Sequence, residues 1–293
     1  MTHGIVMHAY NNEQIDYSLI ALCNALMIKE NLNVPVCLIT YTGCVDWLVQ
    51  SRGQKLVDKA FDHVVIQDLD NKKVSKKRFG DTPHSSHTLP WYNTTRTHTY
   101  NLTPFDETLL IDSDYLVMDK NLNVVWGSAH DVMISKEAIS LSHHPMRNSE
   151  KWLDDTGIKM CWATCLYFKK SKTAETLFDL VNHIKANYEY YAMVYGFDIQ
   201  LYRNDFAFSV AVHMMNGFVP DGEEIQSLPF SLLTSFDCDD LIDVPAKNEM
   251  KFLINDRKEN WKFYLTKTKE MNVHVLNKFA ILRQAEKFLE YYG

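Results

Sequence analysis

The sequence has no apolar run that approaches the eighteen or more residues of a membrane-spanning helix. Its start, Met1-Thr2-His3-Gly4, lacks the cationic segment that opens a secretory signal, so we expect neither a secreted nor a membrane protein. Internal repeats, low-complexity tracts and a Pro/Gly/Ser-rich linker are also missing. These absences exclude solenoid and multi-domain arrays and favour one continuous domain over residues 1–293.

Cysteine is scarce and unpatterned, with six in 293 residues and none in a CxxC pair. No spacing matches a zinc ribbon, so we interpret all of them as reduced thiols of a cytoplasmic protein. The six are Cys23, Cys37, Cys44, Cys161, Cys165 and Cys238.

Positive charge is in deficit, since 30 Lys and Arg stand against 37 Asp and Glu for a net charge of −7. This balance argues against a protein that binds nucleic acid by bulk charge, and it leaves room for a local basic patch. Apolar residues make up 46% of the chain and charged residues 23%, which is enough to build a large core and excludes intrinsic disorder.

The first half alternates apolar strand-like runs with helical periodicity. Strands separated by helices predict βαβ units, and therefore an α/β fold with a mixed, mostly parallel sheet flanked by helices. We expect strands over 4–9, 34–40, 63–67 and 108–117, and helices over 13–32 and 45–52.

The second half is less regular. We expect strands over 132–135 and 161–168, and helices over 173–191, 206–215, 247–265 and 278–291. The stretch 71–96 shows no clear periodicity, and a long irregular segment inside a compact domain is usually functional or mobile.

The strongest chemical signal is Asp112-Ser113-Asp114, which follows the apolar residues Leu109 to Ile111. Carboxylates beside a buried strand are costly unless a cation compensates them, and two positions apart they point to the same side. Mn²⁺ or Mg²⁺ prefers such oxygen ligands and keeps positions open for phosphate oxygens. The alternative is a solvated turn that happens to read DSD.

The segment around this motif resembles the one leading into the DxD motif of GT-A glycosyltransferases, especially the glycogenin-like group. A basic residue precedes the DxD by 16 positions in that family, and 112 − 96 is also 16 here. The resemblance implies that Arg96 contacts the donor nucleotide or sugar, that Asp112 and Asp114 hold Mn²⁺ against its diphosphate, and that Ser113 also faces the donor. The run that carries it is Thr95-Arg96 followed by Leu102-Thr103-Pro104-Phe105-Asp106-Glu107-Thr108-Leu109-Leu110-Ile111-Asp112-Ser113-Asp114.

Both ends of the chain extend the resemblance. The run from Met7 to Asn11 is similar to the family's first strand and nucleotide loop, which implies that Ala9, Tyr10 and Tyr17 surround the base and ribose. His274 is similar to the family's late metal-binding histidine and Lys278 to the phosphate-binding lysine beyond it, although the family's intervening glycine is absent here. The resemblance thus divides the chain into a nucleotide-sugar half, 1–118, and an acceptor-side half, 119–293.

Candidate acceptor residues follow from the same likeness. Trp162 and Thr164 occupy the place of a strand that lines the sugar, and for Trp162 the alternative is core packing. Asp205 stands where the family has an aspartate near the reacting carbon, where it orients sugar hydroxyls or acts as a general base. The alternative is that Asn204 or Asp205 caps a helix.

A basic stretch, Lys72 to Arg78, precedes Trp91 and Tyr92 in the irregular segment. Charge runs are usually solvated surface, but cations beside aromatic rings also hold phosphates and stack bases. The sequence is also similar in style to glycosyltransferases of tailed bacteriophages, some of which modify hydroxylated bases in DNA. The resemblance therefore implies a DNA acceptor held by Lys76, Lys77 and Arg78.

The function we expect is transfer of a sugar from a nucleotide-sugar, by analogy a UDP-sugar, to an acceptor hydroxyl, with a hydroxymethylated base in phage DNA as the leading acceptor. A glycan or protein acceptor is the alternative within this class. A nucleotidyltransferase or nucleotide-sugar hydrolase would use the same metal, but the loop after the first strand lacks the expected Gly and Arg residues. A non-catalytic nucleotide-binding module is the alternative from another class.

Overall fold

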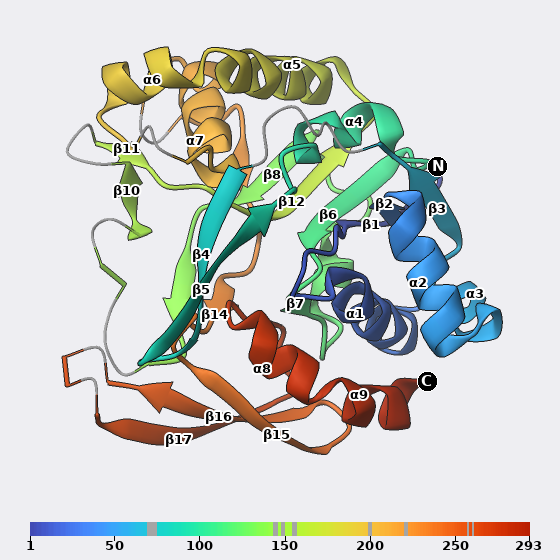
Figure 1. The fold of residues 1–293 in the computed structure, drawn as a ribbon. Helices are drawn as coiled ribbons and strands as arrows, with labels where there is room; N and C mark the ends of the chain where they lie inside the picture. The colour runs from blue at the N-terminus through green and yellow to red at the C-terminus, as the bar shows by residue number, and fades with distance from the viewer. Residues whose placement is uncertain are drawn as a thin grey trace.

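A seven-stranded sheet forms the centre of the molecule (Figure 1). The computed structural model describes residues 1–68, 75–142, 146–147, 150–153, 157–198, 201–219, 222–256, 258–259 and 261–293. Within them the strand order is β13-β8-β12-β6-β1-β2-β3. The bounds are β1 (His3–His8), β2 (Val36–Thr40), β3 (His63–Ile66), β6 (Glu107–Asp112), β8 (Val132–Ser135), β12 (Trp162–Lys169) and β13 (Gln226–Ser227).

The strand directions decide where a ligand can bind. β1 runs parallel to β2 and β6, and β2 runs parallel to β3, so these four strands end at one edge of the sheet. β12 is antiparallel to both β6 and β8. The predicted α/β class with a mixed, mostly parallel sheet is confirmed. In such sheets ligands gather at the carboxyl ends of the strands.

Helices cover both faces of this sheet, with α5 to α7 above it in Figure 1 and α1, α8 and α9 below. α1 packs against α9, α3 and α2, whereas α7 packs against β12 and α5. No helix in the described ranges is long and apolar enough to cross a bilayer. The helices are α1 (Tyr17–Leu32), α2 (Thr42–Arg52), α3 (Gln54–Ala60), α4 (Thr99–Leu102), α5 (Lys172–Ala186), α6 (Tyr188–Tyr195), α7 (Asn204–Met215), α8 (Lys278–Arg283) and α9 (Ala285–Tyr292), with 3₁₀ turns η1 (Arg96–His98) and η2 (Asn121–Val125).

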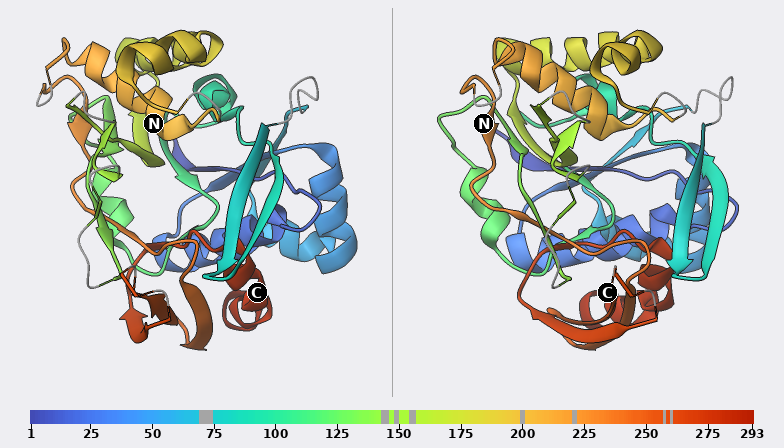
Figure 2. Two further views of the ribbon diagram at one scale, coloured as in Figure 1. Left: turned by 60° about the vertical axis from the view of Figure 1, so that its left-hand side comes forward. Right: turned by 90° about the vertical axis from the view of Figure 1, so that its left-hand side faces the viewer.

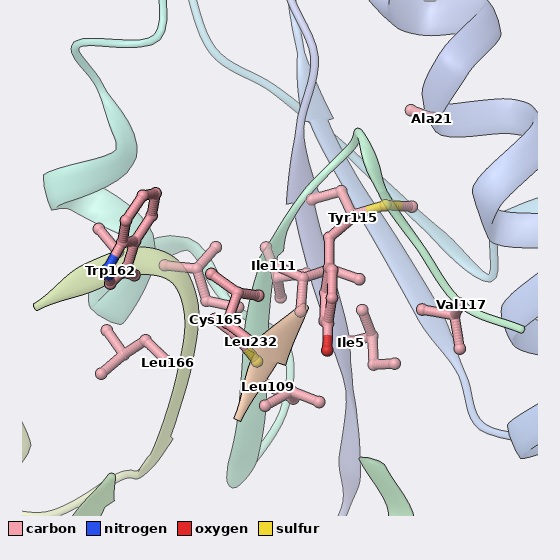
Figure 3. Packing of buried hydrophobic residues seen from close by; sticks show 14 of the residues in the cluster. Ile5, Ala21, Leu109, Ile111, Tyr115, Val117, Trp162, Cys165, Leu166 and Leu232 are labelled. Carbon is pink, nitrogen blue, oxygen red and sulfur yellow. The ribbon is translucent and has the colours of Figure 1, made fainter. Parts of the chain in front are cut away.

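The core is densest where β1, β6 and β12 meet (Figure 3). Ile5 pairs in register with Leu109, and Cys165 pairs with Ile111, and all four side chains are fully buried. Apolar side chains on both faces of a strand are the mark of a sheet covered by two layers. This packing fixes the end of β6, so the residues that follow it start from a rigid position.

Small sheets bring later parts of the chain back to the end of β6. One has the order β7-β18-β14-β9, from β7 (Tyr115–Leu116), β18 (Val273–His274), β14 (Leu232–Thr234) and β9 (Ala138–Ser140). In it β18 pairs antiparallel with β7, which places His274 opposite Tyr115. A separate two-stranded sheet joins β10 (Trp152–Leu153) to β11 (Ile158–Lys159).

The irregular segment expected over 71–96 is instead largely a β-hairpin, β4 (Ser75–Thr82) and β5 (Ser85–Trp91). Its residues 71–74, including Lys72 and Lys73, lie outside the described residues. The hairpin stands at the side of the molecule, as the right-hand view of Figure 2 shows. Its inner face mixes Lys77 with Phe79 and Leu89, so the usual alternation of apolar and polar residues is absent and the strands were not recognised.

The helix expected over 247–265 is wrong. This region belongs to an antiparallel sheet of β15 (Asp240–Ala246), β16 (Glu249–Asn255) and β17 (Phe263–Lys269). Met250, Phe252 and Ile254 are buried in strict alternation, which is the period of a strand. Asn248 adopts a left-handed φ of 59° in the turn between β15 and β16, a conformation that asparagine tolerates and that ends a helix.

The helix expected over 173–191 is divided into α5 and α6. Asn187 ends the first and begins the second, with φ −116° and ψ 34°. Its backbone N–H still bonds to the carbonyls of His183 and Ile184, so the chain bends rather than breaks. The remaining expected strands and helices are found close to their expected positions.

Candidate functional site

The two carboxylates of the DSD motif lie at the carboxyl end of β6. Asp112 is the last residue of the strand, and Asp114 follows in a two-residue turn before β7. Asp114 is only 4% exposed, and Ser113 between the two carboxylates is equally buried. The strand before them is fully buried, so the solvated-turn alternative does not describe Asp114. A buried carboxylate needs a compensating charge.

His274 completes a cluster with these carboxylates. Its Nε2 lies 3.6 Å from Asp114 Oδ1 and 3.9 Å from Asp112 Oδ2. Its other ring nitrogen, Nδ1, is 3.4 Å from Thr164 Oγ1 on β12. The three potential ligand atoms all lie within 4.8 Å of one another. The pairing of β18 with β7 therefore brings together residues separated by 160 positions in the sequence (274 − 114).

The outer oxygens of both carboxylates are held by cations. Arg96 Nη1 donates to Asp112 Oδ1 at 2.7 Å, and Lys278 Nζ donates to Asp114 Oδ2 at 2.5 Å. Arg96 is 1% exposed, and it also donates to the backbone carbonyls of Ala163 and Thr164. Its guanidinium thus ties Asp112 to β12, while the inner oxygens of the carboxylates stay directed at His274.

This arrangement fits a divalent ion. A six-coordinate ion with bonds of roughly 2.1 Å separates neighbouring ligands by roughly 3 Å and opposite ligands by roughly 4.2 Å. The separations of 3.6 and 3.9 Å lie in that range. Two carboxylate oxygens and one imidazole suit Mn²⁺ or Mg²⁺. Asp112, Asp114 and His274, predicted as ligands from the sequence, are the residues that would hold it.

The protonation states support the same interpretation. Burial alone would raise the pKa of Asp114, but the Lys278 ammonium and the His274 ring outweigh it and hold this pKa well below its ordinary value. Burial raises the pKa of Tyr17 well above its ordinary value, and the charges of Asp114 and Asp112 add to the effect. Asp114 is therefore ionised and Tyr17 is neutral around pH 7, so the ligand oxygens carry the charge that a cation needs.

A cleft of about 540 Å³ opens beside the cluster, at the carboxyl ends of β1 and β6. It is lined by most of the residues that the sequence singled out, namely Tyr10, Tyr17, Lys77, Arg78, Arg96, Asp112, Ser113, Asp114, Trp162, Thr164, Asp205, His274 and Lys278. Ala9 and Lys76 do not line it. Ala9 is buried beside β2, where its carbonyl accepts from Thr40 Oγ1. Lys76 is exposed on the outer face of the hairpin.

Tyr10 lies at one end of the cleft. Its hydroxyl is 2.8 Å from Thr95 Oγ1 and donates to Gln67 Oε1 at 3.1 Å. Its ring is parallel to that of Tyr41, with the centroids 6.5 Å apart. Burial raises the pKa of Tyr10 to about 12, so the hydroxyl remains a neutral group that can donate a hydrogen bond.

Trp162 lies at the start of β12, beside the core residues labelled in Figure 3, and it is buried. It also lines the cleft. The two interpretations of this residue, core packing and ring stacking, are therefore compatible.

Asp205 does not cap a helix, contrary to one alternative. It lies in the first turn of α7, where no side chain caps the N-terminus. Its Oδ1 accepts from the Ala163 N–H at 2.9 Å, and its Oδ2 accepts from Arg203 Nη2 at 3.1 Å. Ala163 thus links Asp205, through its N–H, to Arg96, through its carbonyl. One backbone unit of β12 positions both side chains.

Lys77 differs from its neighbours in the basic stretch because it points inward from the hairpin. Its ammonium lies 5.7 Å from the ring centroids of both Phe79 and Trp91. Burial lowers the pKa of Lys77 to about 8, and the nearby Lys278 and Arg203 contribute to this shift. The three cations predicted to act together are therefore divided, with Lys76 and Arg78 exposed and Lys77 partly buried.

Three further residues line the cleft without being predicted as binding residues from the sequence, namely Asn93, Tyr202 and Asn204. In each, one buried side-chain oxygen has no hydrogen-bond partner within the described ranges, namely Asn93 Oδ1, Tyr202 Oη and Asn204 Oδ1. Asn93 adjoins Trp91 and Tyr92, and Asn204 adjoins Asp205, so proximity to predicted residues was the only available signal.

Comparisons with known proteins give a likeness in fold. No family model matches the chain. No curated protein sequence matches it either. Among solved structures, it is similar to the apo-form glycosyltransferase GlyE of Streptococcus pneumoniae TIGR4, with 12% identity, a TM-score of 0.44 and 78% of this chain aligned to 45% of GlyE. The galactosyltransferase LgtC, bound to donor and acceptor sugar analogs, gives 12% identity, a TM-score of 0.41 and coverage of 71% and 70%.

A third similar structure belongs to another class. It is the 4-diphosphocytidyl-2C-methyl-D-erythritol synthase of Anaerococcus prevotii, with 11% identity, a TM-score of 0.36 and coverage of 78% of this chain and 88% of that one. The chain spans about half the length of GlyE. At these identities and scores the function depends on the chemistry of the cleft itself.

The metal cluster can be tested by removing one ligand. Asp114→Asn should abolish Mn²⁺ binding, measured by water proton relaxation with and without UDP, because it removes a charged ligand oxygen. It should also lower the free energy of unfolding by about 3–5 kcal/mol, because Lys278 is left buried without its carboxylate. The double variant Asp114→Asn/Lys278→Met should recover most of this stability and none of the Mn²⁺ binding.

Asp46→Asn is the matched control, since Asp46 is exposed on α2 and does not line the cleft. It should leave Mn²⁺ binding and stability unchanged. Wild-type Mn²⁺ affinity in the double variant would contradict the assignment of Asp114 as a ligand.

We expect the charged form of Lys77 to lower the free energy of unfolding. Because its folded pKa is about 8 and its ordinary value is 10.5, the unfolded chain binds more protons between these pH values, and stability rises with pH there. Lys77→Met should therefore raise the unfolding temperature at pH 7 by a few degrees. This gain should decrease from pH 8 toward pH 10.5 in a series of thermal melts. Lys76→Met, at an exposed neighbour, should give no pH-dependent difference, and a constant gain for Lys77→Met would contradict the shift.

Proposed function

We propose that this protein is a metal-dependent glycosyltransferase that moves a sugar from a nucleotide-sugar to an acceptor hydroxyl. The observation that supports it is the cluster of Asp112, Asp114 and His274 at the carboxyl end of a sheet, beside a cleft of about 540 Å³ that also holds Lys278. This combination suits a ligand that carries a diphosphate. Residues 1–293 form one domain in this proposal, because one cluster of buried side chains runs through both halves.

Mn²⁺ or Mg²⁺ bound by these three residues supplies Lewis-acid stabilisation of the nucleoside diphosphate that leaves. Lys278 lies at the same point and neutralises phosphate charge as the bond to the sugar breaks. Arg96 is a positioning residue, because its guanidinium is engaged by Asp112 and by the carbonyls of β12. It holds Asp112 in the orientation that a metal needs.

The acceptor hydroxyl attacks the anomeric carbon of the donor sugar, and the bond between that carbon and the diphosphate oxygen breaks. Asp205 lines the same cleft, with both carboxylate oxygens held by Ala163 and Arg203. Two roles are open to it: orienting the sugar hydroxyls, or accepting the proton of the attacking hydroxyl in an inverting reaction. Tyr10, Tyr17 and Ser113 line the donor side, where we place the base and ribose of a uridine nucleotide.

Two other functions would use parts of this site. A nucleotidyltransferase needs a phosphate loop after the first strand, and this chain has His8, Ala9 and Tyr10 there, two of which are buried side chains in hydrogen-bonded positions. A non-catalytic nucleotide-binding module needs no paired carboxylates. The paired carboxylates with His274 suit a metal that acts on a leaving diphosphate, and this chemistry favours the enzyme.

A hydroxymethylated base in duplex DNA is one candidate acceptor, and a glycan or protein hydroxyl is the other. The DNA acceptor is supported by Lys76 and Arg78, which are exposed on the hairpin, Arg78 at the cleft itself, where duplex phosphates can reach them.

The donor site can be tested by thermal denaturation with UDP, GDP, CDP and dTDP, each with Mn²⁺ and with chelator. A nucleotide at about a hundred times its dissociation constant stabilises the folded state by roughly 2.7 kcal/mol, a shift of several degrees. We expect a Mn²⁺-dependent shift with UDP that is absent in Asp114→Asn/Lys278→Met and present in Asp46→Asn. No shift with any nucleotide would contradict the proposed function.

The DNA acceptor can be tested with a duplex that contains 5-hydroxymethylcytosine. If Lys76 and Arg78 hold its phosphates, Lys76→Ser/Arg78→Ser should weaken binding roughly tenfold at low salt and reduce the salt dependence. Lys55→Ser/Lys120→Ser removes two exposed cations elsewhere and is the matched control. Equal binding by both double variants would rule out this acceptor surface.

A further inference from the structure

Part of the cleft lining comes from the hairpin and the approach to α7, and not from the strands that carry the metal cluster. Its residues are Lys77, Trp91, Asn93, Tyr202 and Asn204. The two segments are in contact, since the rings of Trp91 and Tyr202 have centroids 6.5 Å apart and Asn204 Nδ2 donates to the Asn93 carbonyl at 2.9 Å. We refer to these five residues as the opposite wall, because they belong to other elements than the metal ligands.

The opposite wall holds polar atoms whose hydrogen bonds are unmade. Asn93 Oδ1, Asn204 Oδ1 and Tyr202 Oη are buried and have no partner in the described parts of the chain. Asn204 as a whole is 8% exposed. A buried polar atom without a hydrogen bond destabilises the fold, so three on one wall need an explanation. Two carbonyl oxygens and one hydroxyl complement a ligand with several hydroxyl groups.

Lys77 adds a charge to this wall. Its ammonium makes no ion pair with any described residue, and it lies over the rings of Phe79 and Trp91. The carboxylates that act on it, Asp114 and Asp205, are already paired with Lys278 and Arg203. A partly buried ammonium without a counter-ion favours a ligand that brings a negative charge.

The opposite wall and the metal cluster share one anchor. Ala163 of β12 donates its N–H to Asp205, next to Asn204, and accepts at its carbonyl from Arg96, which holds Asp112. A molecule on this wall therefore shares the cleft with a diphosphate on the metal. From there its hydroxyl groups can approach the sugar of a donor.

From these contacts we infer that the opposite wall is a subsite for a small saccharide acceptor that carries a phosphate or carboxylate beside its hydroxyl groups. The anionic group pairs with Lys77, the hydroxyl groups donate to Asn93 and Asn204, and Tyr202 donates to a ring or hydroxyl oxygen. The word acceptor rests on the proposed function, whereas the binding of an acidic saccharide does not. A neutral sugar would leave Lys77 unpaired, and a duplex would meet the exposed Lys76 and Arg78 of the hairpin.

The test is calorimetric titration of the full chain with glucose 6-phosphate, glucuronate and methyl glucoside, both alone and with UDP and Mn²⁺. Glucose 6-phosphate and glucuronate distinguish the two sources of charge, and methyl glucoside is neutral. We expect at least one acidic sugar to bind roughly tenfold more tightly than methyl glucoside, as one charge-assisted contact predicts. Lys77→Gln should reduce this difference to less than about twofold, while Lys76→Gln should leave it unchanged.

Tyr202→Phe separates a binding role from a structural one. It removes a hydroxyl that has no partner in the described protein, so the free energy of unfolding should not fall. Binding of the acidic sugar should weaken by roughly threefold, the loss expected for one neutral hydrogen bond. A variant that unfolds more easily and binds the sugar normally would assign the hydroxyl to the fold and contradict its place in the subsite.

The outcomes separate this inference from the proposed function. Equal affinity for acidic and neutral sugars, or an unchanged preference in Lys77→Gln, overturns the subsite even if UDP binds with Mn²⁺. Charge-dependent binding of UDP-glucuronate over UDP-glucose, without any such preference among the free sugars, assigns Lys77 to the donor and overturns the acceptor. Because the sugars are also titrated without nucleotide, failure of UDP to bind contradicts the proposed function alone.

Discussion

Two carboxylates at the end of a fully buried strand impose a constraint that much of this structure serves to satisfy. β6 places Asp112 and Asp114 at the edge of the sheet, where Asp114 is almost completely removed from water. An uncompensated charge there would cost several kcal/mol. The compensation comes from distant parts of the chain: Arg96 before the strand, and His274 and Lys278 near its end. The pairing of β18 with β7 and the start of α8 are thus placed by an electrostatic requirement as well as by packing.

The cleft treats its cations in two ways. Arg96 and Lys278 bind the outer oxygens of the carboxylates and leave the inner oxygens directed at His274. These two cations therefore orient the carboxylates. Lys77 is held over two aromatic rings, with burial and two neighbouring cations lowering its pKa. Such a position is unfavourable for the free protein. A strained or costly group that persists in a cleft is more readily explained by a ligand than by the fold.

The sequence predicts the metal cluster and Lys278, and it predicts much less of the opposite wall. Asp112, Asp114, His274 and Lys278 belong to motifs with a fixed chemistry, so residue type and order were sufficient to find them. The opposite wall has no such motif, because the oxygens of Asn93 and Asn204 become significant only when the tertiary structure leaves them without partners. The sequence does not predict the hairpin because its inner face is partly polar, and it predicts a helix at β16 although the buried residues there alternate.

Charge balance links the metal to its ligand. Without an ion, the charges of Asp112 and Asp114 are already balanced by Arg96 and Lys278. A divalent ion therefore brings two charges into a partly buried site whose own charges sum to zero. In such surroundings this excess is unfavourable until an anion arrives, and a nucleoside diphosphate supplies one at the position of the open metal ligands. Because the protein has already neutralised its own carboxylates, the ion and the diphosphate should bind cooperatively. The charge of each reduces the unfavourable electrostatic energy of binding the other.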